Sequence, residues 1–186
     1  MFKQRIIQKF TIFLLMPLST VFAQDWVLTP KSVINFDIRS LGVSVVGGDF
    51  KKYQSKMVFD PTQLQTAQVS FVLDVESLVF TRESFKKMIL GEDYFDVNKY
   101  KTISYKGNKF TALGNHKYRI DGNLTLRGVT KPVTFNTSLA PNKTNPKLYD
   151  TKAEAIIHRS DFGMKKAPAG GGEKVNIRLS GQWQQP

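Results

Sequence analysis

The sequence predicts an all-β protein built from antiparallel strands. Three observations lead to this prediction. Apolar and polar residues alternate with a period of two over most of the chain after residue 24. Short polar or glycine-containing stretches separate the alternating segments. Only one segment, around residues 81–91, carries apolar residues at helical spacing. About eight or more strands with short connections favour an up-and-down barrel or a sandwich.

The first 23 residues have the pattern of a secretory signal peptide. Basic residues at 3–9 precede an apolar stretch at 11–18, and Ala23 supplies the small residue of a cleavage site. The apolar stretch is shorter than the ~20 residues that span a bilayer, and we identify no later segment long enough to do so. We therefore expect cleavage after Ala23 and a periplasmic mature domain at 24–186. A retained anchor helix is the alternative.

The alternating segments define the expected strands in order along the chain. In each of them the apolar residues share one parity and the polar residues the other, which is typical of a strand with one dry and one wet face. Gly114-Asn115 suits a two-residue hairpin turn, and the stretch 127–132 indicates another tight connection. The clearest alternating segments are 34–39, 69–76, 118–127, 133–139 and 174–180.

One segment breaks the alternation and predicts a single short helix. Phe85, Met88 and Ile89 fall at helical spacing. Thr81 is the candidate residue to cap its start, and Gly91 is the candidate to end it. We expect this helix to shape or cover one end of the β-structure.

Composition narrows the classes of function. The chain has no cysteine, which rules out disulfide scaffolds, thiolate metal sites and thiol catalysis. His116 and His158 are the only histidines, and neither has the spacing of a zinc site or of a serine hydrolase. The net charge of +12 would suit nucleic acid, but the aromatic residues lie mainly on the predicted inner parity. We therefore expect no metal, no cofactor and no nucleic-acid partner, whereas isolated acids leave a two-carboxylate hydrolase open.

Several short motifs, in their order and spacing, make the chain resemble a known family. They extend over nearly the whole mature chain, and the strongest is the run from Gly122 to Val133. The full set is Trp26, Ser32 to Phe36, Gly48 to Phe50, Asp93 to Asp96, Thr102 to Tyr105, Gly122 to Val133 and Arg159 to Gly163. With these motifs the chain resembles the YceI-like family of lipid- and polyisoprenoid-binding proteins. Lys101 stands where a proline is usual, and Met88-Ile89 replace the usual His-Leu.

The resemblance implies an extended, lipocalin-like, eight-stranded antiparallel barrel. It also implies that the interior holds an amphiphile with a long apolar tail, such as a polyisoprenoid or an isoprenoid quinone. It implies no catalysis and no required cofactor. An eight-stranded barrel is just wide enough either to be filled by its own side chains or to enclose one slender ligand.

Residues of the inward parity are the candidate lining of such a tunnel. The helix residues and Phe95 join them because they are expected to cover one barrel end. The same side chains could instead meet across the axis and close a dry core. The candidate ligand-binding residues are Phe36, Ile38, Val69, Phe71, Leu73, Met88, Ile89, Phe95, Ile103, Tyr105, Ile120, Leu124, Leu126 and Phe135.

Other interpretations stay open at this point. Arg159 and Asp161 either make a polar contact at the tunnel or form a pair that fixes the turn before Gly163, and we favour the turn. The whole protein could instead be an envelope stress or interaction protein that has a dry barrel and docks a partner through its basic surface. A hydrolase or isomerase acting on a bound lipid is a further alternative. We also expect a homodimer, which is common among small β-barrels.

Overall fold

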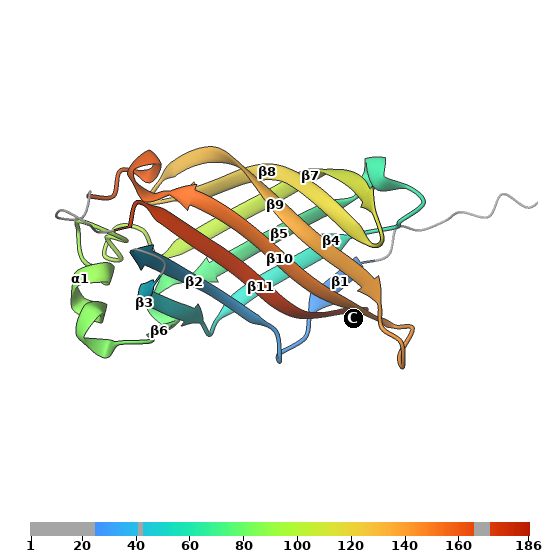
Figure 1. Ribbon diagram of the computed structural model, residues 1–186, viewed down its shortest axis with the longest axis horizontal. Helices are drawn as coiled ribbons and strands as arrows, with labels where there is room; N and C mark the ends of the chain where they lie inside the picture. The colour runs from blue at the N-terminus through green and yellow to red at the C-terminus, as the bar shows by residue number, and fades with distance from the viewer. Residues whose placement is uncertain (1–24, 41–42, 166–171) are drawn as a thin grey trace, which may run out of the picture.

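The chain folds into one closed barrel of antiparallel strands (Figure 1). The computed structural model describes residues 25–40, 43–165 and 172–186, so the predicted signal peptide lies outside the described residues. The strands are β1 (Asp25–Leu28), β2 (Val33–Ser40), β3 (Val43–Phe50), β4 (Tyr53–Val58), β5 (Gln68–Asp74), β6 (Leu78–Phe80), β7 (Thr102–Gly114), β8 (Lys117–Leu126), β9 (Val129–Pro141), β10 (Leu148–His158) and β11 (Lys174–Gln184).

Three of the barrel strands are interrupted, so that eleven segments make eight strands. β1 and β2 lie one after the other along the same edge of β11, through the pairs Leu28–Trp183 and Ile38–Val175. β4 and β3 continue each other beside them, followed by β5 and β6. Because β1 pairs with both β4 and β11, the ring closes. This confirms the predicted eight-stranded antiparallel barrel with one short helix.

The breaks in the interrupted strands lie side by side and are bridged by hydrogen bonds. The backbone N–H of Lys52 donates to the hydroxyl of Ser77 at 2.9 Å, and that hydroxyl donates to the carbonyl of Asp74 at 2.6 Å. The hydroxyl of Tyr53 donates to the carbonyl of Ser32 at 3.1 Å, at the break between β1 and β2. These bonds satisfy polar groups that the interrupted ladders leave over.

Two tight turns join β7 to β8 and β8 to β9. Asn115 and His116 have φ angles of 49° and 58°, and Arg127 and Gly128 have φ angles of 52° and 72°. Two successive positive φ values are typical of the type I′ turn, whose twist matches that of the flanking strands. The second predicted connection is confirmed as a tight turn, but it is limited to Arg127-Gly128, because 129–132 belong to β9. The first hairpin turn falls one residue later than predicted, at Asn115-His116, with Gly114 still in β7.

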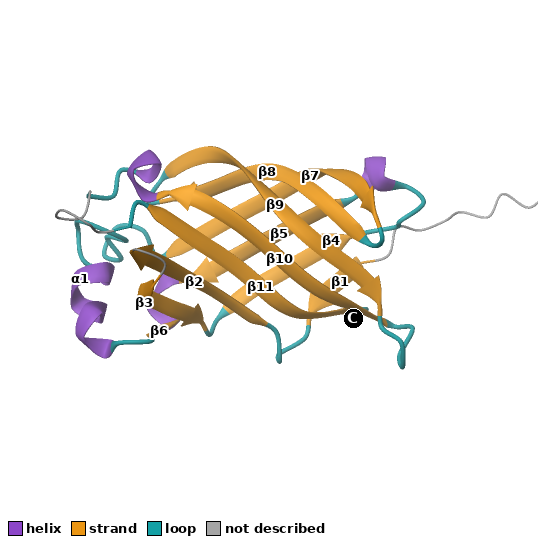
Figure 2. Cartoon of the chain, viewed as in Figure 1, coloured by secondary structure: helices purple, strands orange, loops and turns teal. Residues whose placement is uncertain are grey.

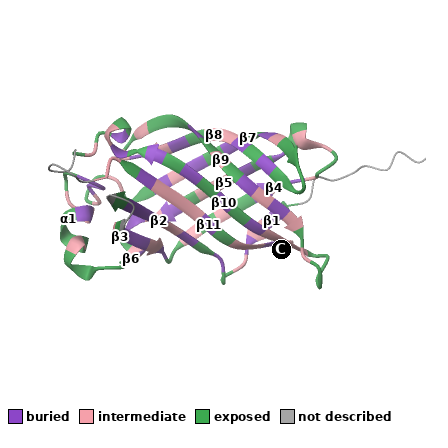
Figure 3. Ribbon diagram, in the orientation of Figure 1, coloured by how far each residue is buried: buried purple, intermediate pink, exposed green. Residues whose placement is uncertain are grey.

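Burial alternates along the strands, as the sequence pattern predicts (Figure 3). In β7, for example, Ile103 and Tyr105 are buried while Thr102 and Lys106 are exposed. The inward side chains of all strands form one continuous apolar core. The fold therefore gives the barrel a dry interior and a wet outer surface.

Aromatic side chains fill the barrel end at which β1 and the C-terminal residues lie. Phe59 contacts Tyr118 and Tyr149 edge to face, with ring centroids 5.4 and 5.6 Å apart. Trp26 packs against Tyr149 at 4.9 Å, and both tryptophans of the chain are 2% exposed. Aromatic pairs in this geometry attract beyond their burial. We call Trp26, Phe59, Phe110, Tyr118 and Tyr149 the aromatic plug.

A short helix, α1 (Lys86–Leu90), lies at the opposite end of the barrel (Figure 2). It follows a 3₁₀ turn at Glu83–Phe85, so the predicted helix around residues 81–91 is correct in place. The proposed capping role of Thr81 is wrong, because its hydroxyl donates to the carbonyl of Gly47 at 3.2 Å and the helix begins five residues later, at Lys86. Gly91 does end the helix. We call this end of the barrel the α1 end.

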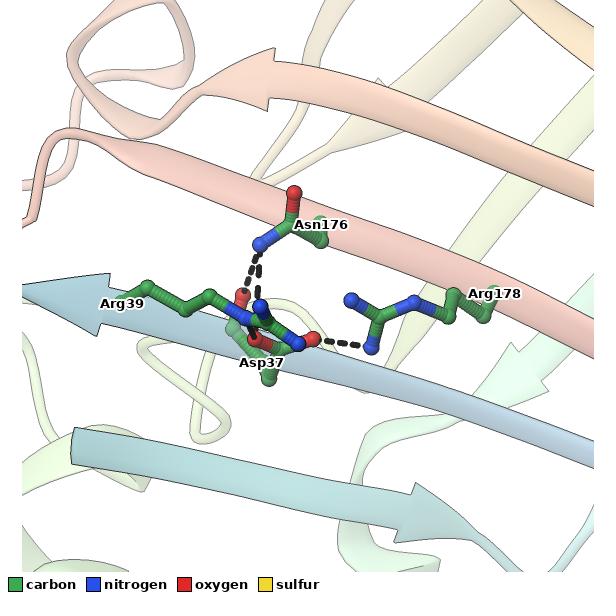
Figure 4. Close-up of polar contacts among 4 residues, drawn as sticks. All are labelled: Asp37, Arg39, Asn176 and Arg178. Atoms are coloured by element: carbon green, nitrogen blue, oxygen red, sulfur yellow. Dashed lines mark hydrogen bonds and ion pairs between the residues drawn. The ribbon is translucent and has the colours of Figure 1, made fainter. Parts of the chain in front are cut away.

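A charged cluster joins β2 to β11 on the outside of the barrel (Figure 4). Asp37, on the face of β2 opposite to Phe36, accepts hydrogen bonds from Nε of Arg39 at 2.8 Å and from the guanidinium of Arg178. Burial alone would raise the pKa of Asp37, but the hydrogen bonds from both arginines outweigh it and hold that pKa below its ordinary value. The cluster thus stabilises the pairing of these two strands.

Candidate ligand-binding cavity

The barrel interior holds a cavity of about 120 Å³ whose lining comes from all eight strands. The structure places every predicted lining residue along this cavity except Met88. That side chain points away from the barrel and is 44% exposed, while its neighbour Ile89 is buried against the core. The assignment of Met88 to the lining is therefore wrong, because a single helical turn has one inward side. Contact of the other residues with a ligand stays a prediction.

Sequence reasoning missed part of the lining. Several of the missed residues lie on β10 and β11. On β10, small or polar side chains such as Thr151 and Ala153 weaken the alternation. The further lining residues include Ile34, Phe50, Met57, Tyr94, Thr137, Leu139, Thr151, Ala153, Ile157, Arg159, Met164, Val175, Ile177, Leu179 and Trp183. The missed residues on β10 could have been found from their spacing, because residues 151, 153 and 157 are all odd-numbered and therefore lie on one face of the strand.

The cavity is long but narrow. It extends from Thr151 to Arg159, eight residues along β10, which is roughly 20 Å along the axis at ~3.3 Å per residue and a tilt of about 40°. A cavity of about 150 Å³ holds benzene, so 120 Å³ takes only a few carbon groups without movement. Ring pairs such as Tyr105–Phe135, at 4.8 Å, fill much of the interior. A long tail must therefore displace some inward side chains.

Tyr105 presents an apolar surface to the cavity although it carries a hydroxyl. Its hydroxyl lies 3.1 Å from the carbonyl of Ile120 and 3.2 Å from that of Val133. Gly122 makes room for this arrangement, since a Cβ there would lie 2.7 Å from the tyrosine oxygen. Burial, with a smaller contribution from the charge of Asp121, raises the pKa of Tyr105 far above its ordinary value. The hydroxyl is thus neutral and already occupied by the backbone.

Arg159 is the charged side chain at the α1 end of the cavity. It begins a 3₁₀ turn at Arg159–Phe162, which ends at Gly163 with a left-handed φ of 69°. The residue is 4% exposed, and its guanidinium lies 5.8 Å from the ring centre of Tyr94. Its Nε lies 3.7 Å from a carboxylate oxygen of Glu173. Among the residues that the structure describes, neither Nε nor Nη2 meets a hydrogen-bond acceptor.

The favoured interpretation of Arg159 and Asp161 as a pair is wrong. Asp161 is exposed, whereas Arg159 continues the inward parity of β10 and reaches the cavity. The partner of Arg159 is Glu173, which precedes β11. The hydrogen bond that its side chain accepts from the backbone N–H of Ser160, at 2.9 Å, lowers the pKa of Glu173. The carboxylate beside Arg159 is therefore ionised at neutral pH.

Two further polar groups border the cavity, nearer the aromatic plug. They are the hydroxyls of Thr137 and Thr151, on neighbouring strands β9 and β10. Both are buried, and neither has a hydrogen-bond partner within the described chain. Neutral hydroxyls are weaker donors than a guanidinium.

The two ends of the cavity are closed in different ways. Trp183 and Leu139 end the lining beside the aromatic plug, whose residues belong mostly to strands. At the α1 end, Ile89, Tyr94 and Phe95 cover the cavity from α1 and the segment that follows it. The covering at this end is thus one short helix and its loop.

Hydrogen bonds tie this covering segment to the turn that carries Arg159. Arg127 donates from Nη2 to the carbonyl of Glu92 at 3.0 Å and from Nη1 to the carbonyl of Gly163. The backbone N–H of Lys165 donates to the carbonyl of Asp93 at 2.8 Å. These bonds lie outside the regular ladders of the barrel.

Over residues 25–40, 43–165 and 172–186, no three histidine or acidic side chains gather closely enough to hold a metal ion. In the same ranges no helix has the length and apolar character needed to cross a membrane.

Comparisons with known proteins agree on the fold. A family model described as the YceI-like domain matches residues 26–183. A UPF0312 protein of Vibrio cholerae is 32% identical over 117 residues, 61% of this chain and 62% of that protein, so the match spans less than two thirds of the relative. The structure of BcnA from Burkholderia cenocepacia has a TM-score of 0.76 at 21% identity and covers 85% of this chain and 99% of its own.

A second solved structure is that of a polyisoprenoid-binding domain from Saccharophagus degradans, described as implicated in plant cell wall breakdown. It has a TM-score of 0.62 at 10% identity and covers 89% of this chain and 100% of its own. At these identities the likeness to both structures shows the fold alone.

Proposed function

Because this chain belongs to the YceI-like family, we propose that it binds a long-chain amphiphilic lipid, a polyisoprenoid or an isoprenoid quinone, inside the barrel. It transports or stores this lipid in the periplasm and does not change it chemically. The observation that carries the proposal is the continuous apolar cavity between Arg159 and Trp183. The description of the Saccharophagus degradans domain as polyisoprenoid-binding supports the same class of ligand.

The energy of binding comes from the tail. Burial of each methylene-sized group gains about 0.8 kcal/mol, so ten groups give about 8 kcal/mol before the cost of ordering the ligand. Displacing the inward-pointing rings offsets part of that free energy. Phe71 and Trp183, whose ring centroids are 5.7 Å apart, are an example of such a pair. The cavity therefore selects slender, flexible tails over rigid ring systems.

The ligand enters and leaves at the α1 end. Entry there requires the displacement of Ile89, Tyr94 and Phe95, which one helical turn and its loop hold in place. Entry at the other end would require the aromatic plug and its paired strands to separate, which breaks ladder hydrogen bonds as well as packing. The first path costs less.

Native mass spectrometry of protein purified from the periplasm tests the proposal. We expect a bound lipid that organic solvent extracts, and uptake of an added prenyl lipid by the delipidated protein. N-terminal sequencing of the same preparation should begin at Gln24 if export and cleavage occur as predicted. The extracted lipid should be recovered unchanged after incubation with the protein. Repeated recovery of lipid-free protein with no uptake would instead favour a dry barrel that docks a partner through its basic surface.

A further inference from the structure

We infer that Arg159 binds the polar head of the lipid through Nε and Nη2, and that this head is an uncharged oxygen acceptor, such as a quinone or amide carbonyl, rather than a phosphate. The inference rests on the proposed function, because it concerns the same cavity. It adds the orientation of the ligand and the chemistry of its head.

The first step is that Nε and Nη2 of Arg159 are buried hydrogen-bond donors without an acceptor among the described residues. Its side chain is almost fully buried at the edge of the cavity, and both nitrogens lack an acceptor for their N–H groups within the described chain. A buried donor without a partner is costly, and more so when it is charged. Tyr94 lies against the guanidinium, and Glu173 forms an ion pair with Nε at 3.7 Å, which is too long for a hydrogen bond, so neither contact supplies an acceptor. An acceptor oxygen from a ligand would complete the site.

The second step concerns charge. The ionised carboxylate of Glu173 already compensates the charge of Arg159. Arg178 also borders the cavity, but its guanidinium is bound to Asp37. Arg127 uses two of its N–H groups on the backbone of the covering loops. A phosphate with a charge of about −1.5 to −2 would thus meet one compensated cation and a nearby carboxylate.

An uncharged carbonyl oxygen meets no such penalty. It accepts one or two N–H groups and leaves the ion pair between Arg159 and Glu173 intact. With the head at the α1 end, the tail extends toward Trp183 along the roughly 20 Å of apolar lining. The head is then the last part of the ligand to enter and the first to leave.

Three probes with the same prenyl chain test the inference on the complete mature protein. One ends in hydrogen, one in a benzoquinone and one in a monophosphate. We expect the quinone to bind about ten- to hundredfold more tightly than the hydrocarbon, as one hydrogen bond to a charged donor implies, and the phosphate to bind less tightly than the quinone. Equal binding of quinone and hydrocarbon, or tightest binding of the phosphate, would overturn the assignment.

Variants locate the effect. Arg159→Met should remove the advantage of the quinone and leave the affinity for the hydrocarbon unchanged. The matched control is Arg119→Met, which removes an arginine from the outer face of β8 and should preserve the advantage. Glu173→Gln should raise the affinity for the phosphate several-fold. If Thr137→Val with Thr151→Val removes the advantage and Arg159→Met does not, the head lies at the opposite end and the inference is wrong.

A measurement on the wild-type protein covers the case in which Arg159→Met does not fold. The carbonyl stretch of the bound quinone should move to lower wavenumber than in a hydrocarbon solvent, because a guanidinium hydrogen bond weakens the C=O bond. An unshifted band would refute the inference. If none of the three probes binds, the proposed function fails and this assignment with it, whereas hydrocarbon binding without any preference for a head overturns the assignment alone.

Discussion

A larger side chain in the cavity should stabilise the protein and weaken ligand binding at the same time. Ala153 borders the cavity from β10 and is 6% exposed. Ala153→Leu adds three carbon groups, whose burial gains about 2.4 kcal/mol at ~0.8 kcal/mol each, less the cost of any crowding. The same groups occupy space that the lipid tail would fill. The ligand therefore loses about 2.4 kcal/mol, and its Kd rises about fiftyfold.

Urea unfolding and titration with a prenyl hydrocarbon measure the two effects. The matched control is Ala155→Leu, on the same face of the same strand. Ala155 is equally buried, at 5% exposure, but it lies outside the cavity lining, so crowding should destabilise the protein by about 1–3 kcal/mol. If Ala153→Leu destabilises as much as the control and leaves Kd unchanged, the tail does not occupy the space beside Ala153.

Three further changes test other parts of the structure. Tyr105→Phe should lower the free energy of unfolding by about 1 kcal/mol in urea, because the hydroxyl that donates to the carbonyls of Ile120 and Val133 with its single proton is lost; no loss would show that this hydrogen bond contributes nothing. Asp37→Asn should destabilise at neutral pH by about 1 kcal/mol. Folding lowers the pKa of Asp37, so its contribution to the free energy of unfolding is fully present above the ordinary pKa of 3.8 and is lost as the pH falls below it. The melting temperatures of variant and wild type should therefore converge in acid, and a difference that stays constant with pH would contradict this. A disulfide formed after Asp93→Cys and Lys165→Cys, in a chain without other cysteines, should slow lipid exchange until it is reduced, and unchanged rates would argue against entry at the α1 end.

The antiparallel strands and part of the cavity lining follow from the period-two pattern, whereas the choice of a closed barrel over a sandwich came from the family resemblance. Side chains such as Phe36 and Leu124 point inward because alternate residues of a strand face opposite sides, and closure of the sheet turns one side into the interior. β10 was harder to find, since Thr151 and Ala153 are too small or too polar to mark an apolar face. The interruptions of β1/β2, β3/β4 and β5/β6 depend on contacts between distant segments, which no local pattern contains.

Arg159 shows a different failure of sequence reasoning. Its position continues the inward parity of β10, so the signal was present, but a charged residue is normally assigned to the wet face. Met88 shows the reverse case, because an apolar residue in a five-residue helix was assigned inward without a second turn to define the buried side. Both errors come from inferring the direction in which a side chain points from its polarity alone.

The three aligned breaks divide the wall of the barrel into two parts. Seen from β11, the segments β2, β3 and β6 form a small flap beyond these breaks, and in the part of the chain that the structure describes β6 pairs with β3 alone. The ring itself closes through β1, at the end that carries the aromatic plug. Widening of the barrel at the α1 end would therefore leave the ladder hydrogen bonds around β1 in place.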